Sequence, residues 1–423
     1  MIHIKVIREN PGLIQQAARN RGMEVDVDAI LGMDSQRRDA LYQVEQKKAL
    51  RNETSKKVGE LRKAGEDATE MIAAMRRLGD EIRELDERTA DIEAKLHDAL
   101  LELPNIPRDE VPVGEDKPDN EIVRTWGEKP RFDFAPKPHW AVGEALGVMD
   151  FDSSAKIAGS RFVTQFGAGA AIERALISFM LDVHVAEHGY TEVWPPHMAL
   201  PECLVGTGSL PKFEEDLFKL REGLYMVPTA EVPLTNLHRD EILDAGELPK
   251  RYTAYTPCYR AEAGAAGKEA RGLIRRRQFH KVELMKFCTA EQEDEELEKL
   301  VADAEQIVQR LGLHYRVSLL CTGELTFASY KTYDIEGYFP GLDAYYELSS
   351  CSIYGEFQSR RCNTRYRPEP GARPRFVRTM NGSGLATGRT LAAIFETYQR
   401  ADGTVEVPEV LRPYMRGQSV IGL

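Results

Sequence analysis

The chain has 423 residues, of which 42% are apolar and 29% charged, which is enough for a sizeable core shared among two or three domains. The net charge of -12 disfavours binding of nucleic acid by the surface as a whole, so contact with RNA requires local basic patches. Six scattered cysteines without a CxxC pair, no signal peptide and no apolar run of about 18 residues predict a cytoplasmic protein without a disulfide framework or a transmembrane helix.

Residues 1–30 are predicted to form a short strand or turn followed by a helix. From about residue 34 to residue 103 proline is absent, and in the second half of this segment apolar residues recur at alternating spacings of four and three. This heptad seam predicts a long helix, and the weaker pattern of residues 35–63 predicts another. Because Gly65 interrupts the pattern between them, the two helices are expected to pack antiparallel as an arm on the order of 40–50 Å long.

The arm carries a basic cluster on a protein that is acidic overall. A charged face on a coiled coil is usually a solvated face. A stiff cationic rod is also suited to A-form RNA, which offers mainly its shape, phosphates and 2′-hydroxyls. Both interpretations stay open from the residues alone. The cluster consists of Lys47, Lys48, Arg51, Lys56, Lys57, Arg62 and Lys63.

The prolines of the LPNIP segment end the arm, and the acidic residues 108–135 are predicted to be an irregular linker. A mixed pattern follows, with helices expected near residues 171–187, 290–311 and 385–399. Short β-rich runs linked like hairpins predict an antiparallel sheet flanked by these helices, an α+β domain. The chain is therefore divided into an N-terminal domain (1–107, with the arm at about 34–103), a linker (108–135) and a second domain (136–423).

The segment 256–283 is the most informative part of the second domain. It is predicted to form two strands joined by a cationic loop, with Arg260 and Glu262 sharing one face and Phe279 and Glu283 sharing a face of the return strand. Arginine forks bind phosphate oxygens, and an aromatic ring can stack on a base. The hairpin therefore suits a nucleotide, although a solvated charged hairpin is the simpler alternative. The loop cations are Lys268, Arg271, Arg275, Arg276 and Arg277.

Three further segments carry oxygen-rich or cationic side chains. Thr229 and Glu231 are expected on one face of a short strand, where both can accept hydrogen bonds from an ammonium group. Glu347 and Ser350 are three residues apart, so a regular strand places them on opposite faces, and only a bulge or a strand end brings them together. A Gly-rich turn at 380–386 is predicted to enter a helix with Arg389 in its first turns, where an anionic ligand would offset the unfavourable helix dipole.

The motif HVAEH, with His184 and His188 four residues apart on a predicted helix, spells the HxxEH pattern of a zinc site. A match of five residues arises easily by chance, and this one ends an amphipathic helix. The segment 188–198 is, by its prolines, an edge strand stopped by Pro195 and Pro196.

The sequence YRAEAGAAGKEARGLIRRRQFHKVE closely resembles motif 2 of seryl-tRNA synthetases, class II enzymes that join serine to its tRNA. Residues 188–198 resemble motif 1, which in this family builds the dimer interface, and residues 380–399 resemble motif 3. The three motifs occur in the family's order, and the similarity extends over essentially the full length. The resemblance implies a homodimer that activates serine with ATP and then charges tRNA(Ser), held by the basic cluster of the arm.

The resemblance also implies a role for individual residues. Arg260 and Arg389 are the expected catalytic cations, and Glu347 and Ser350 are expected to hold the Mg²⁺ bound to ATP. The expected ATP-binding residues are Arg260, Ala261, Glu262, Phe279, Glu347, Leu348, Ser349, Ser350 and Arg389. The expected serine-binding residues are Thr229, Ala230, Glu231, Arg260, Glu283 and Ser383.

Some positions depart from the family's pattern, namely Glu324, Gly337, Tyr338, Ile353 and Tyr354. They leave the details of the serine pocket open. An alternative is a synthetase-like paralogue that activates an amino acid but charges a carrier protein, or that only binds. The long basic arm speaks against the first, and the retained Arg260, Glu283 and Arg389 speak against the second.

Overall fold

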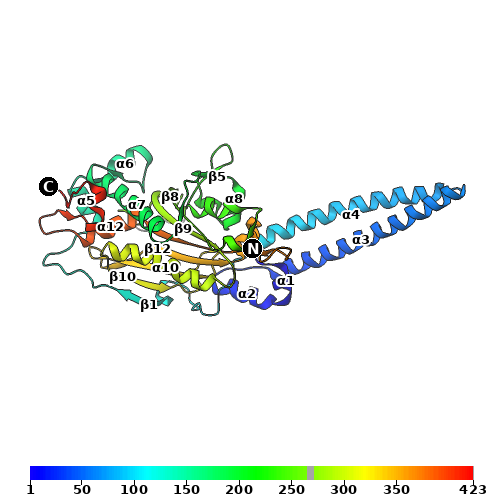
Figure 1. Ribbon diagram of the computed structural model, residues 1–423, viewed down its shortest axis with the longest axis horizontal. Helices are drawn as coiled ribbons and strands as arrows, with labels where there is room; N and C mark the ends of the chain where they lie inside the picture. Colours follow the sequence, from blue (N-terminus) through cyan, green and yellow to red (C-terminus); the bar gives the residue numbers. More distant parts are fainter. Residues whose placement is uncertain (264–270, 423) are drawn as a thin grey trace. The chain divides into compact units, whose positions relative to one another are not determined.

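The computed structural model describes residues 1–263 and 271–422 and divides the chain into two compact units (Figure 1). The first unit comprises Met1–Arg19 and Met23–Pro104, and the second comprises Asn20–Gly22 and Asn105–Leu423. Of the loop cations expected from the sequence, Lys268 lies outside the described residues.

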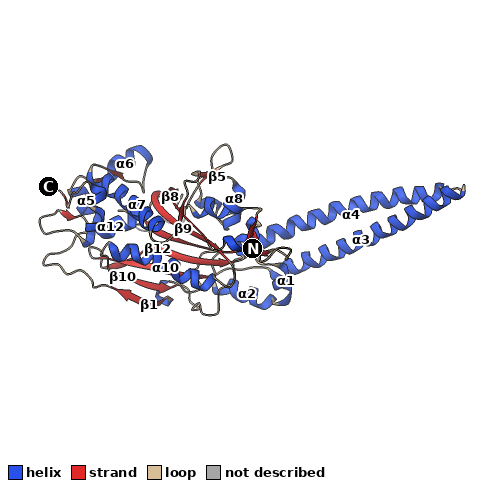
Figure 2. Ribbon diagram, viewed as in Figure 1, coloured by secondary structure: helices blue, strands red, loops and turns tan. Residues whose placement is uncertain are grey.

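The first unit is helical, and its two long helices lie side by side as a hairpin (Figures 1 and 2). The strand or turn expected at the N-terminus is wrong, because the His3 side chain accepts a hydrogen bond from the Lys5 amide and caps a helix instead. Gly65 ends the first long helix in a left-handed conformation (φ 77°), which glycine adopts without strain. The helices are α1 (Ile4–Glu9), α2 (Pro11–Asn20), α3 (Val27–Ala64) and α4 (Thr69–Leu101).

The heptad seam is confirmed on α4. Ile82, Thr89, Ile92 and Leu96 are buried, and they follow one another at spacings of seven, three and four. This spacing keeps one side of the helix turned toward its partner. On α3, Ala40, Val44 and Val58 are buried apolar residues of the arm.

The second unit is built on an eight-stranded sheet in the order β1-β10-β11-β12-β15-β9-β8-β4. All neighbouring strands are antiparallel except β4 and β8, so the predicted antiparallel sheet is confirmed. The strands are β1 (Glu121–Trp126), β4 (Thr191–Glu192), β8 (Lys250–Tyr259), β9 (Gln278–Cys288), β10 (Tyr315–Leu319), β11 (Lys331–Phe339), β12 (Ala344–Gly355) and β15 (Arg378–Ala386).

Helices and smaller strands surround this sheet (Figure 2). The other helices are α5 (His139–Ala145), α6 (Phe151–Ala158), α7 (Ala168–Ala186), α8 (Pro201–Thr207), α9 (Glu231–Thr235), α10 (Glu293–Arg310), α11 (Phe357–Cys362) and α12 (Thr387–Thr397). The short strands are β2 (Met149–Asp150), β3 (Thr164–Gln165), β5 (Met198–Ala199), β6 (Tyr225–Met226), β7 (Ile242–Asp244), β13 (Arg365–Arg367), β14 (Arg375–Phe376), β16 (Val405–Glu406) and β17 (Val420–Ile421).

Three local expectations are wrong. Residues 108–135 are not wholly irregular, because β1 pairs with β10 and satisfies its backbone groups at the edge of the sheet. Glu231 begins helix α9 rather than sharing a strand with Thr229. The glycine-rich residues 380–386 belong to the central strand β15 rather than to a turn.

The glycines of β15 allow helices to approach the sheet closely. A Cβ atom on Gly382 would lie 2.9 Å from Cys351 Sγ and 3.3 Å from a side-chain carbon of Leu300 on α10. A Cβ atom on Gly384 would lie 2.7 Å from His184 Nε2 on α7. Because side chains alternate along a strand, Asn381 is turned toward the opposite face, which is free for chemistry.

We predict that Gly384→Ala destabilises the protein by about 1–3 kcal/mol, because the added methyl group must displace a packed histidine. The unfolding midpoint in urea measures this effect. Gly246→Ala is the control, since no atom lies within 4 Å of a Cβ placed there. An unchanged midpoint for Gly384→Ala would contradict the tight packing of α7 on β15.

Candidate functional site

A cavity of about 640 Å³ opens on the face of the sheet opposite α7 and α10. It is lined by side chains from β9, β12, β15, the end of β8 and the start of α9. Seven of the residues expected from the sequence line it, namely Thr229, Glu231, Arg260, Glu262, Glu347, Ser350 and Ser383.

Arg260 and Glu262 both reach the cavity, although they do not share a strand. Strand β8 ends at Tyr259, and Glu262 has a left-handed backbone (φ 54°). The guanidinium of Arg260 lies 5.1 Å from the centre of the Phe279 ring, a cation–π contact that holds it over β9. Glu262 accepts a hydrogen bond of 2.6 Å from Arg275 Nε and thereby ties the far side of the loop to this wall.

A bulge brings Glu347 and Ser350 to the same cavity. On β11, Ile335 pairs with Ser349 and the next residue, Glu336, pairs with Glu347, so Leu348 is the extra residue. The bulge reverses the alternation of the strand, and Glu347 then faces the side to which Ser350 belongs. The sequence analysis required a bulge or a strand end to bring Glu347 and Ser350 together, and this bulge is present.

An acidic pair lies beside this bulge. Asp334 pairs with Ser350 across the strands, and its Oδ1 atom is buried without a hydrogen-bond partner among the described residues. Burial and the neighbouring Glu347 carboxylate raise the pKa of Asp334 well above its usual value. Burial would also raise the pKa of Glu347, but the Arg389 guanidinium outweighs it and lowers that pKa.

Arg389 lies in the first turn of α12 and reaches across to β12. Its Nη1 atom is 3.1 Å from Glu347 Oε2 and donates to the Glu347 carbonyl oxygen at 2.9 Å. Its Nε atom donates to the carbonyl oxygen of Ile274, which lies in the part of the cationic loop that precedes β9. The arginine therefore joins the helix, the strand with the acidic pair, and the loop.

The other end of the cavity holds two carboxylates close together. Glu283 on β9 is fully buried and does not line the cavity itself. Its Oε2 atom is 2.5 Å from Lys281 Nζ and accepts a 2.6 Å hydrogen bond from Thr229 Oγ1. Its Oε1 atom accepts from Asn381 Nδ2 at 2.9 Å, and the same Nδ2 lies 3.3 Å from Glu231 Oε2.

Unlike Glu283, Glu231 makes no ion pair within 4.0 Å among the described residues. Its Oε1 atom accepts a hydrogen bond of 2.6 Å from Gln358 Nε2. Burial and the charge of Glu283 raise the pKa of Glu231 to about 7. A carboxylate in this state gains most from a ligand that brings its own positive charge.

The remaining expected residues support the walls rather than line them. Ala230 and Leu348 have no exposed surface, and both pack in the core. Ser349 Oγ donates to the Ser383 carbonyl oxygen at 2.6 Å, and the Ala261 amide donates to the Asp216 carbonyl oxygen.

Sequence reasoning missed Lys281, Asp334 and Asn381 as site residues. Asn381 stands in the quoted glycine-rich segment. Lys281 stands in the quoted motif 2 segment, on the strand face expected for Phe279 and Glu283, but it was not assigned a role in the site. The departure at Gly337 is explained by packing, since a Cβ atom there would lie 2.6 Å from Leu348 Cδ1 of the bulge.

The basic cluster of the arm is partly neutralised within its own unit. Lys47 and Lys48 of α3 pair with Glu81 and Asp86 of α4 across the hairpin, and Lys57 pairs with Glu53. The structure gives no ion pair within 4.0 Å, in the part of the chain it describes, for the other four members, Arg51, Lys56, Arg62 and Lys63.

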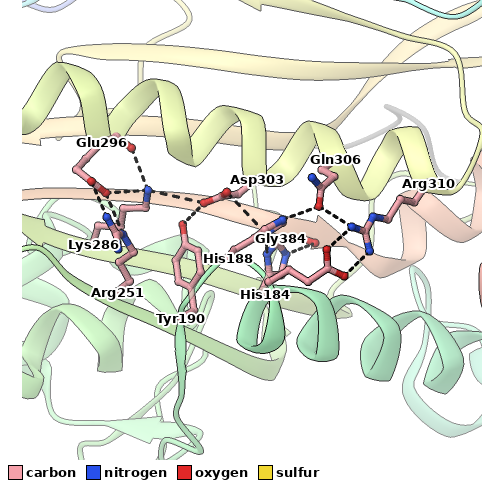
Figure 3. Close-up of polar contacts among 11 residues, drawn as sticks. His184, His188, Tyr190, Arg251, Lys286, Glu296, Asp303, Gln306, Arg310 and Gly384 are labelled. Carbon is pink, nitrogen blue, oxygen red and sulfur yellow. Dashed lines mark hydrogen bonds and ion pairs between the residues drawn. The ribbon is translucent and has the colours of Figure 1, made fainter.

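His184 and His188 belong to a polar network beneath the sheet (Figure 3). His184 Nε2 lies 3.4 Å from the Gly384 carbonyl oxygen, and the Nδ1 atoms of the two histidines are hydrogen-bonded to each other at 2.9 Å. Their lone pairs therefore do not converge on a shared point. Among the described residues, no group of three or more His, Cys, Asp or Glu side chains is arranged to hold a metal ion.

The same network contains the fully buried Lys286 of β9. Its Nζ atom is 3.1 Å from Glu296 Oε2 on α10, and the Glu296 carboxylate also receives a bidentate contact from Arg251 (Figure 3). Tyr190 donates to Asp303 on the same helix at 2.9 Å. The network ties α10 to β8 and β9 behind the cavity.

Two protein-family models match the chain. The seryl-tRNA synthetase N-terminal domain matches residues 1–107, and the tRNA synthetase class II core domain (G, H, P, S and T) matches residues 212–398. The serine–tRNA ligase of Carboxydothermus hydrogenoformans is 54% identical over 98% of both chains, and that of Pelotomaculum thermopropionicum is 52% identical over 100% of both. The chain belongs to the seryl-tRNA synthetase family.

Solved structures of the family agree with this assignment. The seryl-tRNA synthetase of Pyrococcus horikoshii, determined with ATP, is 37% identical, with a TM-score of 0.93 over 100% of this chain and 99% of that one. The cytoplasmic serine–tRNA ligase of Naegleria fowleri, determined with AMP, is 28% identical, with a TM-score of 0.88 over 100% and 98%. The predicted class II fold and the predicted activity of a serine–tRNA ligase are confirmed.

We predict a pH-dependent difference in stability between the protein and its Glu231→Gln variant. The raised pKa means that the folded state keeps a proton which the unfolded state loses between about pH 4.5 and about pH 7, so the wild type loses stability as the pH rises through this window. Glutamine does not titrate. The measurement is the free energy of unfolding of both proteins in urea. The value for the variant minus that for the wild type is expected to be larger at about pH 8 than at about pH 5, by on the order of 1–3 kcal/mol. An equal difference at both pH values would contradict the raised pKa.

Proposed function

We propose that the cavity activates serine with ATP to form seryl-adenylate and then transfers the seryl group to the terminal adenosine of tRNA(Ser). The observation that supports this proposal is the composition of one cavity. One of its ends has cationic side chains and the bulge of β12 and suits a nucleotide, and its other end is built from two carboxylates and an amide. The family's structures with ATP and with AMP support the nucleotide.

At the nucleotide end, Arg260 binds the α-phosphate and the serine carboxylate, and Glu262 contacts ATP. Phe279 and Arg389 enclose the adenine and the phosphates. In the first step a serine carboxylate oxygen attacks the α-phosphorus in line, and the bond to pyrophosphate breaks. The chain's residues position the two reactants and neutralise charge, so no side chain has to transfer a proton.

Magnesium fits the acidic side of this end. The Asp334 Oδ1 atom is buried without a hydrogen-bond partner among the described residues, and burial and the Glu347 carboxylate raise the pKa of Asp334, so an added cation would favour the ionised pair. Glu347 and Ser350 would hold the ion through oxygen atoms, the ligands that Mg²⁺ prefers. When bound with ATP, the ion neutralises charge on the phosphate oxygens.

At the other end, Glu231 and Thr229 receive the ammonium group of serine, and Ser383 meets its hydroxyl group. Glu283 was expected to touch that hydroxyl, but it lies beneath the cavity surface and holds Thr229 and Asn381 from behind. A pocket that hydrogen-bonds a hydroxyl rejects alanine, because its polar groups would be left unpaired. Threonine must be excluded by its bulk.

We also propose that the N-terminal domain, residues 1–107, binds tRNA(Ser) through the basic cluster, and that residues 108–135 lead to the catalytic domain, residues 136–423. A homodimer through the motif 1 segment is supported by its exposed apolar side chains Trp194, Met198 and Leu200. No described helix has the length and apolar character needed to cross a membrane. A cytoplasmic location fits the substrates.

The alternative, a paralogue that charges a carrier protein, is disfavoured. Carrier-charging relatives typically lack the long arm, whereas this chain has α3 and α4. Its relatives named as serine–tRNA ligases match over the full length.

We predict serine-dependent exchange of pyrophosphate into ATP, together with charging of tRNA(Ser) by the same protein. Glu347→Gln is expected to lower the exchange rate at least about 100-fold, because it removes charge from the proposed metal site. Asp28→Asn, on the outside of the first unit, is the control. Exchange without charging would support the paralogue, and no exchange with any amino acid would contradict the proposed activity.

Removal of the four members of the basic cluster for which the described residues offer no ion pair within 4.0 Å tests the contact of the arm with tRNA. We predict that the variant with Arg51, Lys56, Arg62 and Lys63 changed to alanine keeps serine-dependent exchange and binds tRNA more weakly. Each lost phosphate contact flattens the dependence of log K on log salt by about 0.7–0.9, so the slope changes by up to about 3. The control changes Arg83 and Lys95, which pair locally with Asp80 and Asp91. An unchanged slope would contradict the contact.

A further inference from the structure

Tyr354 lines the cavity and is one of the positions at which the sequence departs from the expected pattern. Ser350, Ser352 and Tyr354 alternate along β12 and all line the cavity. Directly after Tyr354 the pairing of β12 with β15 shifts register, between Ile353 and Gly355, and Gly355 has a left-handed backbone (φ 57°). The strand turns away at this glycine, so Tyr354 is the last side chain that β12 sends toward the two carboxylates.

The hydroxyl group of Tyr354 completes a hydrogen-bonded bridge between those carboxylates. It donates to Asn381 Oδ1 at 2.5 Å. Because that oxygen is occupied, Asn381 Nδ2 is turned the other way, where it lies 2.9 Å from Glu283 Oε1 and 3.3 Å from Glu231 Oε2. The reverse orientation of the amide would set its oxygen against two carboxylates and leave the tyrosine hydroxyl without its acceptor.

The groups around Glu231 show why this bridge matters for a cationic ligand. The charged and polar side chains that face it are Glu283 and Lys281 of β9, Tyr354 of β12, Gln358 of α11 and Asn381 of β15. Lys281 is bound to Glu283 rather than to Glu231. The Glu231 carboxylate therefore accepts hydrogen bonds from the neutral amides of Gln358 and Asn381. Tyr354 fixes the second of these amides.

We propose that Tyr354 is a positioning residue for amino-acid recognition, which holds Asn381 and Glu231 in the arrangement that receives the ammonium group of serine. This inference rests on the proposed function, because it assigns a part to a residue of the same cavity. Tyr354 acts through its neighbours and takes no part in the transfer of the phosphoryl or seryl group.

The test is Tyr354→Phe, which removes one oxygen atom and keeps the ring. In serine-dependent exchange of pyrophosphate into ATP, the KM for serine is expected to rise about tenfold, since a hydrogen bond to a charged network is lost, while kcat and the KM for ATP stay within about twofold. The acidic limb of the pH profile of kcat/KM for serine is expected to move to higher pH, because the Asn381 amide is no longer fixed and its donation to the charged form of Glu231 is weakened. A purely structural role would not move this limb.

Two controls separate a local effect from a general one. Tyr338→Phe makes the same change at a hydroxyl that binds the exposed Asp343, and it is expected to alter neither value. In an Asn381→Ala background, Tyr354→Phe is expected to have little further effect, because its action passes through Asn381.

The proposal is overturned by an unchanged serine KM and pH profile in Tyr354→Phe, by fully additive effects with Asn381→Ala, or by equal losses for serine and ATP. These outcomes presuppose a wild-type protein that exchanges pyrophosphate with serine. Absence of exchange in the wild type itself would instead contradict the proposed function.

Discussion

The two-sided character of strand β15 is the constraint on which the site depends. On one side its glycines admit α7 and α10 so closely that an added methyl group would lie 2.7 Å from His184 Nε2 or 3.3 Å from a side-chain carbon of Leu300. On the other side the alternate residues Asn381 and Ser383 line the cavity. Because the period of a strand is two, close packing behind the sheet and chemistry in front of it are specified by the same short run of residues.

Electrostatics divides the cavity into two ends with different needs. At the nucleotide end Arg389 pairs with Glu347, and the Oδ1 atom of the neighbouring Asp334 is buried without a hydrogen-bond partner among the described residues. The other end holds Glu231 and Glu283, and Lys281 neutralises only the latter. Each end therefore favours the positive charge that its proposed ligand brings. This charge is a phosphate-bound cation at one end and an ammonium group at the other.

The arm is stabilised by a different kind of side-chain packing from that of the catalytic unit. Its seam uses a heptad repeat, and its stability comes from contacts that are local in sequence. Its basic side chains are held on the stiff helix α3, and three of them are partly neutralised by neighbours within the same unit. The members without ion pairs are then the natural carriers of an electrostatic interaction with RNA phosphates.

The sequence by itself determined the helical arm, the antiparallel sheet, the family and seven of the residues that line the cavity. Repeats such as the heptad and motifs such as YRAEAG are written in residue types and spacings, and these do not depend on the rest of the fold. Resemblance to the family also placed Glu347 and Ser350 in one site, although the strand period alone opposed it.

Only the tertiary structure decided where those side chains point. The bulge at Leu348 arises where β12 pairs with β11, and the strand at 380–386 arises from pairing with β12 and β9. Helix α9 begins at Glu231. Local propensity alone does not predict any of these three features. The burial of Glu283 and the bridge from Tyr354 through Asn381 arise in the same way. They join strands that are distant in sequence, and the free energy that selects them comes from contacts formed only when the sheet is complete.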